Sequence, residues 1–411
     1  MWPFPFLEAC PSAVPAAWVS ILSLVLAAAL GPASAAVAAG WSPRGGVGAV
    51  RLVTWPGTWR PPRRAASVAA VEASGVVRSG PATRSPDGVA AAEHGSALWA
   101  SRLSPRGAED QALAGGIMVT EQEVEAIGQV LVDPKQPLQA RFRALFTLRG
   151  LGGPGAIAWI SRAFHDDSAL LKHELAYCLG QMQDSRAIPV LSGVLRDTRQ
   201  EPMVRHEAGE ALGAIGNPQV LELLRQYCSD PTVEVAETCQ LAVRRLEWLQ
   251  QHPGQPAVAG PYLSVDPAPP AEERDLGQLR EALLDETLPL FDRYRAMFAL
   301  RNAGGQEAAL ALAEGLRCGS ALFRHEVGYV LGQLQHEAAV PQLAATLAHP
   351  AESPMVRHEC AEALGAIARP SCLAALHAHT ADPERVVRES CLVALDMYEQ
   401  ERGPFQQDPP P

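Results

Sequence analysis

The sequence contains no pair of cysteines separated by two residues, which is the spacing used by zinc ribbons and dithiol oxidoreductases. Most of its cysteines fall among apolar residues in helical patterns, where a thiol packs as a small hydrophobic side chain. We therefore expect free, buried thiols and a reducing, cytoplasmic environment. The eight cysteines are Cys10, Cys178, Cys228, Cys239, Cys318, Cys360, Cys372 and Cys391.

The sequence also lacks an apolar run long enough for a membrane-spanning helix, which needs about 20 residues. Residues 17–31 form an apolar run of signal-peptide length. The only charged residue before it is Glu8, whereas a secretory signal opens with positive charge. We expect no association with a membrane.

Residues 1–117 contain no lysine, asparagine or tyrosine, yet they hold six of the eight tryptophans. From residue 40 onward this segment is rich in Gly, Pro, Ala and Arg and has no sustained period, which is typical of disorder. We predict that 1–117 is a disordered extension, dispensable or artefactual, with a targeting segment as the alternative. Met118 is a natural first residue for the folded part.

Basic residues are scarce in the rest of the chain. Nine of the 34 basic and six of the 45 acidic residues lie in 1–117, so 118–411 carries 25 basic and 39 acidic residues, a net charge of −14. This balance argues against a nucleic-acid-binding surface and suits a basic partner.

The chain repeats itself from about residue 120 onward, with an offset of 152 residues. Residues 141–153 (RFRALFTLRGLGG) match 293–305 (RYRAMFALRNAGG). The segments PMVRHEAGEALGAI at 202–215 and PMVRHECAEALGAI at 354–367 are identical at 12 of 14 positions. We infer a gene duplication.

Each half contains a shorter repeat of about 30–33 residues, in which a polar turn joins two helices. In one unit, a helix over 187–195 leads to a helix over 202–215, which Pro202 can begin and Gly216-Asn217-Pro218 can end. Four units per half predict an all-α fold, an α-solenoid of eight HEAT-like helical-hairpin repeats. Its expected parts are an N-terminal half at 118–249, a Pro-rich linker at 250–272, a C-terminal half at 273–402 and a disordered tail at 403–411.

Four His-Glu pairs occupy equivalent places in the two middle repeats of each half: His173-Glu174, His206-Glu207, His325-Glu326 and His358-Glu359. On a helical projection of 203–215, the apolar residues form one stripe and His206 lies nearly opposite it. We therefore expect the histidines on a bare, concave helix face outside the core. The equivalent positions of the outer repeats hold other residues, namely Phe142, Val235, Tyr294 and Glu389.

A glycine follows each of these histidines by seven residues, on the same helix face: Gly180, Gly213, Gly332 and Gly365. Glycine within a helix costs about 0.5–1 kcal/mol relative to alanine. We interpret the four glycines as space cleared beside the histidines for a pocket. A fifth pair, His336-Glu337, aligns with turn residues, and we expect it at the surface.

Helices of neighbouring repeats lie about 8–10 Å apart, so histidines of adjacent repeats can meet at one ion. Each half then offers two histidines and a carboxylate, for instance His173, His206 and Glu207. Non-haem Fe(II) oxygenases use such a set, although it also accepts zinc or manganese. If the linker folds the chain back, two such sets face each other as a two-metal centre.

The segments KHELAYCLGQ, MVRHEAGEALGAIG, RHEVGYVLGQ and MVRHECAEALGAI resemble the deoxyhypusine hydroxylase family, and the resemblance covers roughly residues 118–400. It implies an iron-dependent monooxygenase with two Fe(2+) ions per chain. Such an enzyme hydroxylates the deoxyhypusine side chain of translation initiation factor 5A with O₂ and a reductant, and so completes hypusine formation. The metal ligands that it implies are His173, His206, Glu207, His325, His358 and Glu359.

Glu174 and Glu326 each follow a histidine directly, about 100° further around the helix. They either complete the metal coordination or bind the amines of the polycationic substrate side chain. Four further residues are expected to line the substrate slot: Gly180, Gln181, Gly332 and Gln333. We assign no catalytic side chain beyond the metal centre.

Two other classes of function stay open at this point. One is a different HEAT-like metalloenzyme, either a Zn hydrolase or a lyase, and the other is a non-catalytic binding scaffold. Metal analysis and an optical charge-transfer band would separate a zinc enzyme from a di-iron enzyme. Scaffolds rarely place eight metal-type ligands on equivalent helix faces.

Overall fold

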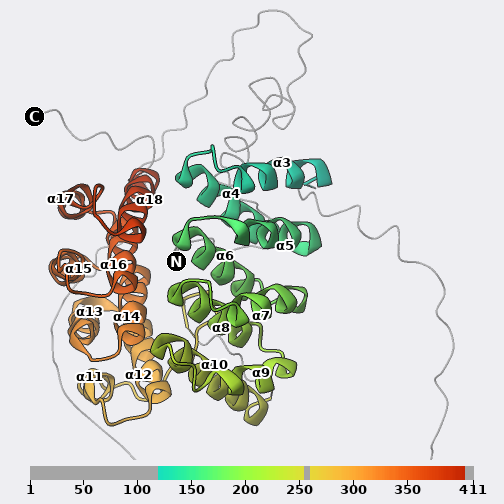
Figure 1. Cartoon of the computed structure of the whole chain (residues 1–411). Helices are drawn as coiled ribbons and strands as arrows, with labels where there is room; N and C mark the ends of the chain where they lie inside the picture. Colours follow the sequence, from blue (N-terminus) through green and yellow to red (C-terminus); the bar gives the residue numbers. More distant parts are fainter. Residues whose placement is uncertain (1–118, 254–259, 403–411) are drawn as a thin grey trace, which may run out of the picture. The chain divides into compact units, whose positions relative to one another are not determined.

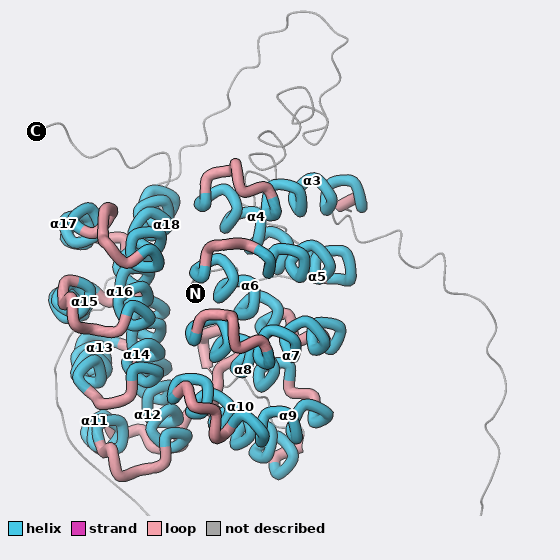
Figure 2. Tube along the Cα trace, viewed as in Figure 1, coloured by secondary structure: helices cyan, strands magenta, loops and turns pink. Residues whose placement is uncertain are grey.

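The computed structural model describes residues 119–253 and 260–402, so the predicted extension over 1–117 and the predicted tail over 403–411 lie outside it. The described residues form sixteen α-helices and no strand (Figure 2). The all-α prediction is therefore confirmed. The helices of the first half are α3 (Glu121–Val132), α4 (Leu138–Leu151), α5 (Gly153–Arg162), α6 (Ala169–Gln181), α7 (Ile188–Arg196), α8 (Pro202–Ile215), α9 (Leu221–Tyr227) and α10 (Val233–Gln251). Those of the second half are α11 (Leu276–Leu284), α12 (Leu290–Ala303), α13 (Gly305–Glu314), α14 (Ala321–Leu334), α15 (Val340–Leu347), α16 (Pro354–Ile367), α17 (Pro370–Ala378) and α18 (Arg385–Arg402).

Each odd-numbered helix packs on the even-numbered helix that follows it, which gives four helical hairpins in each half. Figure 1 shows the even-numbered helices of the two halves turned toward each other, with the odd-numbered helices outside them. At the two ends of this arrangement α18 packs against α4 and α6, and α10 packs against α12 and α14. The eight-repeat solenoid is confirmed, and its halves meet along their inner helices.

Helix α8 has the boundaries that its sequence predicts. Pro202 occupies the first turn, where the lack of an N–H costs nothing. Gly216 ends the helix at φ 75°, a left-handed conformation that glycine adopts without strain. Its apolar stripe, which includes Val204 and Leu212, is buried against the neighbouring helices.

The four glycines that follow the histidines are contact points between inner helices. A Cβ on Gly180 would lie 2.7 Å from the Ala211 Cα, and one on Gly213 would lie 2.7 Å from the Ala242 Cβ. In the second half, Gly332 lies against Ala363 and Gly365 against Ala394 in the same way. The prediction that Gly180, Gly213, Gly332 and Gly365 clear space for a pocket is therefore wrong, because the backbone of the next inner helix fills that space. Their absent side chains let α6 approach α8, and α14 approach α16, closely enough for the histidines to meet.

The duplication produces a pseudo-two-fold axis between the halves. Ser168 Oγ donates to Glu389 Oε2 at 2.6 Å, and its counterpart Ser320 Oγ donates to Glu237 Oε2 at 2.7 Å. The four partners differ by the same 152 residues. This offset also shows that the residue equivalent to Val235 is Val387, which is fully buried, and not Glu389 as the sequence alignment suggested.

The described part of the linker, from residue 260 to α11, is packed into the protein. Residues 264–269 are buried. The Asp266 carboxylate pairs with Arg301 of α12 at 2.6 Å, and its backbone carbonyl accepts from Arg245 Nε of α10 at 2.9 Å. One acidic residue thus joins the inner helices of both halves.

Among the helices of the described residues, none is long and apolar enough to cross a membrane.

Candidate metal centre

The four predicted histidines come together where α6, α8, α14 and α16 meet. Their ring centroids lie 5.4 Å apart for His173 and His206, and 5.2 Å apart for His325 and His358. Across the halves the separations are 5.3 Å for His173 and His358, and 5.3 Å for His206 and His325. The two histidines of the first half and the two of the second half therefore form one cluster.

This cluster is enclosed. All four histidines are 0% exposed, as are Glu174 and Glu326, and Glu207 and Glu359 are 1% exposed. The expectation of a bare, concave face is wrong, because the opposite half covers that face. His336 of the fifth pair lies outside the cluster and accepts a hydrogen bond from Ala338 N, as a surface turn residue does.

In each half, an equivalent glutamate lies beside the first histidine of the pair of repeats. Glu207 Oε2 is 3.3 Å from His173 Nε2, and Glu359 Oε2 is 3.3 Å from His325 Nε2. The side-chain donor atoms of His173, His206 and Glu207 all lie within 4.8 Å of one another, as do those of His173, His325 and His358. Ligand atoms at these separations can share one ion.

Although the 3.3 Å contacts bring opposite charges close, many polar atoms of the cluster make no hydrogen bond of normal geometry among the described residues. They are His173 Nε2, His206 Nε2, both ring nitrogens of His325 and His358, both oxygens of Glu326, Glu207 Oε2 and Glu359 Oε2. A buried polar atom without a partner costs about 1–3 kcal/mol, so such a concentration is unfavourable without a bound cation. Imidazole and carboxylate donors without thiolate fit iron, and also zinc or manganese.

Burial and mutual charge shift the pKa values of these groups in opposite directions. Burial, the largest influence, would lower the pKa of His173, but Glu207 and Glu174 outweigh it and raise that pKa to about 10. Burial, reinforced by the proximity of the other three imidazoles, holds the pKa of His206 well below its usual value. Burial raises the pKa of Glu326 well above its usual value, and Asp266 and Glu207 reinforce the shift. Cations at the cluster would relieve this conflict by pairing with the carboxylates.

Two buried acids of the cluster were missed by the sequence analysis. Glu362 Oε1 lies 3.6 Å from His358 Nδ1, and its counterpart in the first half is Glu210, four residues after His206. Burial, reinforced by Glu207, raises the pKa of Glu210 well above its usual value. An acid one helical turn after a histidine was the available signal, since residues i and i+4 share a helix face.

The glutamines predicted to line a substrate slot are bound to the linker. Gln181 exchanges two hydrogen bonds with the Val265 backbone, at 2.8 and 3.1 Å. Gln333 donates to Ser264 Oγ and Tyr329 Oη and accepts from Arg301. Their substrate role stays a prediction, whereas their contacts with the linker are direct.

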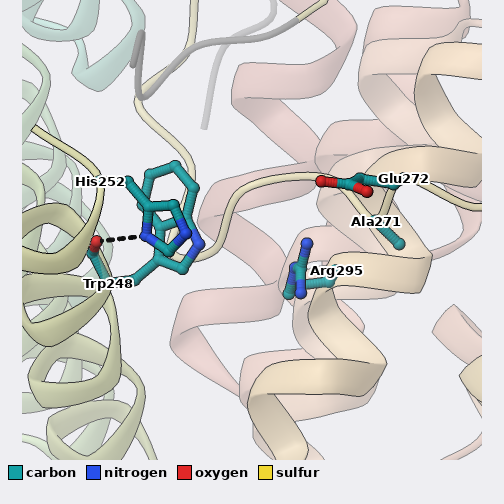
Figure 3. Close-up of a pocket in the computed structure, with 5 residues that line it drawn as sticks. All are labelled: Trp248, His252, Ala271, Glu272 and Arg295. Atoms are coloured by element: carbon teal, nitrogen blue, oxygen red, sulfur yellow. Dashed lines mark hydrogen bonds between the residues drawn. The ribbon is translucent and has the colours of Figure 1, made fainter. Parts of the chain in front are cut away.

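A separate cavity of about 470 Å³ lies between α10, the linker and α12 (Figure 3). The stacked rings of Trp248 and His252 line one side, and Ala271, Glu272 and Arg295 line the other. No predicted site residue lines this cavity.

The chain is similar to known proteins over most of its described length. HEAT repeats match residues 158–244 and 309–396, and the PBS lyase HEAT-like repeat matches 292–318. Deoxyhypusine hydroxylase of Bos taurus is 87% identical over 286 residues, which cover 70% of this chain and 94% of that protein. The Drosophila melanogaster protein of the same name is 58% identical over 289 residues, 70% of this chain and 95% of that protein. A solved structure of human deoxyhypusine hydroxylase in complex with glycerol is 87% identical, with a TM-score of 0.67, and the match covers 68% of this chain and 96% of that chain.

Proposed function

The chain belongs to the deoxyhypusine hydroxylase family. We propose that it hydroxylates the deoxyhypusine side chain as a monooxygenase with two Fe(2+) ions held between its halves. The observation that carries the proposal is the meeting of equivalent histidines and carboxylates of the two halves in one enclosed cluster, with Glu207 3.3 Å from His173 and Glu359 3.3 Å from His325. His173, His206 and Glu207 would hold one ion, and His325, His358 and Glu359 the other. Iron supplies the redox chemistry with O₂ and a reductant that an unreactive C–H bond requires and that side chains lack.

The chain's own residues bind and orient the substrate. Glu174 and Glu326 are fully buried carboxylates beside the histidines, and each can pair with an amine of a polycationic side chain. His173 Nδ1 lies 3.1 Å from Glu174 Oε1 and so fixes the direction of that carboxylate. The enclosure by both halves excludes bulk water, which strengthens each such pairing.

The protein substrate proposed for the chain is translation initiation factor 5A carrying deoxyhypusine, and the compartment is the cytoplasm. The net charge of −14 over residues 118–411 supports this choice, since it attracts a lysine-derived polyamine chain. The same charge disfavours nucleic acid as a partner.

The test is a hydroxylation assay on the purified full chain with its metal content measured in the same preparation. We expect about two iron ions per chain and the gain of one oxygen atom by the deoxyhypusine residue, detected by peptide mass. Reloading the stripped protein with zinc should restore metal content without hydroxylation. Hydroxylation by the zinc-loaded protein would contradict the iron assignment, and iron-loaded protein without turnover would favour a binding scaffold.

A further inference from the structure

A buried arginine recurs at one position of four repeats. Each donates from Nε to the backbone carbonyl ten residues earlier: Arg141, Arg205, Arg293 and Arg357. In three cases the guanidinium also pairs with an aspartate 25 residues later: Asp166, Asp230 and Asp382. The Nη2–Oδ2 distance is 2.6 Å in the Arg205 pair and 2.5 Å in the Arg357 pair. These Arg-Asp clamps connect an inner helix to the loop after the next outer helix.

The fourth clamp has a cysteine in place of the aspartate. Cys318 follows Arg293 by the same 25 residues. Arg293 is 4% exposed, and its Nη2 has no hydrogen-bond partner among the described residues. Its guanidinium lies 4.0 Å from the centroid of the Phe323 ring, which offers a weaker partner than a carboxylate. The buried guanidinium of Arg293 therefore lies beside the neutral thiol of Cys318, whereas the other three repeats place an aspartate carboxylate at this position.

Cys318 is close to the surface although it is only 6% exposed itself. Its neighbours Arg317 and Gly319 are both exposed. The nearby carboxylate of Glu286 accepts a hydrogen bond from Gly319 N at 2.8 Å. Burial, the largest effect, raises the pKa of the Cys318 thiol; the charge of Arg293 opposes this shift, and the charge of Glu286 reinforces it. A smaller fraction of this thiol is therefore ionised than of an ordinary cysteine, and selective oxidation of Cys318 has to come from the stability of the oxidised product.

We propose that Cys318 is an oxidation site whose sulfinate product supplies the missing anion of the fourth clamp. In the first step the sulfur attacks one oxygen of hydrogen peroxide, the O–O bond breaks, and the leaving hydroxide takes the thiol proton as water. The sulfur loses two electrons and becomes a sulfenic acid. A second peroxide converts it in the same way to a sulfinic acid and water, and the sulfinic acid releases its proton to solvent to give the sulfinate. A sulfinate carries one negative charge over two oxygens, as an aspartate does, and can accept from Arg293 Nη2.

The consequence concerns the helix that follows. Cys318 lies two residues before Ser320, whose side chain caps α14, and α14 carries His325. Closing the clamp would tie the start of α14 to α12, so oxidation at this thiol should stabilise the fold.

The experiment has two arms on the full chain with its metal bound. In the first, Cys318→Asp is compared with the neutral isostere Cys318→Asn. We expect the aspartate variant to melt a few degrees above both wild type and the asparagine variant. In the second, wild type and Cys318→Ser are treated with hydrogen peroxide, and peptide masses are read at Cys318 and at the more exposed Cys228.

We expect two oxygen atoms to be added at Cys318 together with a rise in melting temperature that Cys318→Ser does not show. The proposal is overturned if Cys318→Asp is no more stable than Cys318→Asn, or fails to fold. It is also overturned if peroxide adds two oxygens at Cys228 and not at Cys318, or if the doubly oxidised wild type melts no higher than the untreated protein.

Discussion

Tyr177 and Tyr329 place their hydroxyl oxygens 3.2 Å apart, and they are separated by 152 residues, the offset of the duplication. Two equivalent residues can touch in this way only on the axis that relates the halves. Tyr177 follows His173 by four residues and Tyr329 follows His325 by four, so the tyrosines lie one helical turn from the histidines. The pseudo-two-fold axis therefore runs through the tyrosine pair and the histidine cluster.

The first prediction concerns the histidines. Replacing His173 or His325 by Ala removes a ligand atom that no neighbouring residue replaces. The affinity for metal should therefore fall by more than the roughly 10–100-fold that is typical when a residue bonded to a ligand is replaced. Hydroxylation should be lost in parallel. Metal analysis at equal protein concentration checks this. His336→Ala, which alters a surface turn, is the control and should keep its metal; full retention in His173→Ala would remove it from the ligand set.

The second prediction concerns Glu362 and Glu210. Because Glu362 lies 3.6 Å from His358 Nδ1, it can orient the imidazole. Glu362→Gln should weaken metal binding by about 10–100-fold while the melting temperature of the metal-free protein stays within a few degrees. Competition with a chelator measures the affinity. Glu210→Gln should behave alike if the two positions are equivalent, and unchanged affinity in both would mean that neither acid acts on the metal.

The third prediction concerns the glycine contacts. Gly180→Ala places a methyl group against Ala211 and should destabilise the fold by about 1–3 kcal/mol, because α6 and α8 must separate. Metal binding should weaken as well, since these helices carry His173 and His206. The matched control is Gly193→Ala on α7, where a Cβ meets nothing within 4 Å, and which should gain about 0.5–1 kcal/mol. Urea unfolding of the two variants measures both changes in the free energy of unfolding. A loss in Gly180→Ala with a gain in Gly193→Ala would show that Gly180 is needed for close packing of the inner helices.

The fourth prediction concerns the linker. Asp266→Asn leaves the buried guanidinium of Arg301 without its carboxylate and should cost about 3–5 kcal/mol. The exposed Arg280–Glu314 pair provides the comparison, since Glu314→Gln should cost no more than about 1 kcal/mol. Equal effects of the two substitutions in urea unfolding would show that the linker does not hold the halves together.

The fifth prediction concerns metal removal. A cation that binds only the folded chain adds RT ln(1 + [M]/Kd) to the free energy of unfolding, so stripping it should lower the melting temperature. In a His173→Ala, His325→Ala double variant the same chelator should change the melting temperature little. A similar decrease in both proteins would indicate that the stabilising ion binds elsewhere.

The periodicity of the sequence was sufficient to predict the repeats, the helix ends around Pro202 and Gly216, and the grouping of the four histidines. Each of these depends on local spacing along one helix or on the constant offset of 152 residues. Glu207, which the family resemblance implied as a ligand, does lie 3.3 Å from His173, whereas Glu362 beside His358 was not predicted.

The errors have a common physical cause, which is that a helical projection shows a face but not what covers it. The faces of His206 and Gly213 were correctly placed together, yet Ala242 of the next inner helix occupies the space that was assigned to a pocket. The burial of residues 264–269 was equally hidden, because it depends on Arg245 and Arg301 from opposite halves.

The paired contacts Ser168–Glu389 and Ser320–Glu237 have the pattern of an isologous interface, in which residue i of one unit meets residue j of the other and the reverse also holds. Two separate copies of a single four-repeat unit could make these contacts about a true two-fold axis. Such a dimer would bring four histidines together, two from each copy, before any linker existed. The cluster could thus have arisen in a homodimer. Fusion of the two genes would then have freed each half to diverge and added the linker, whose Asp266 joins α10 of the first half to α12 of the second.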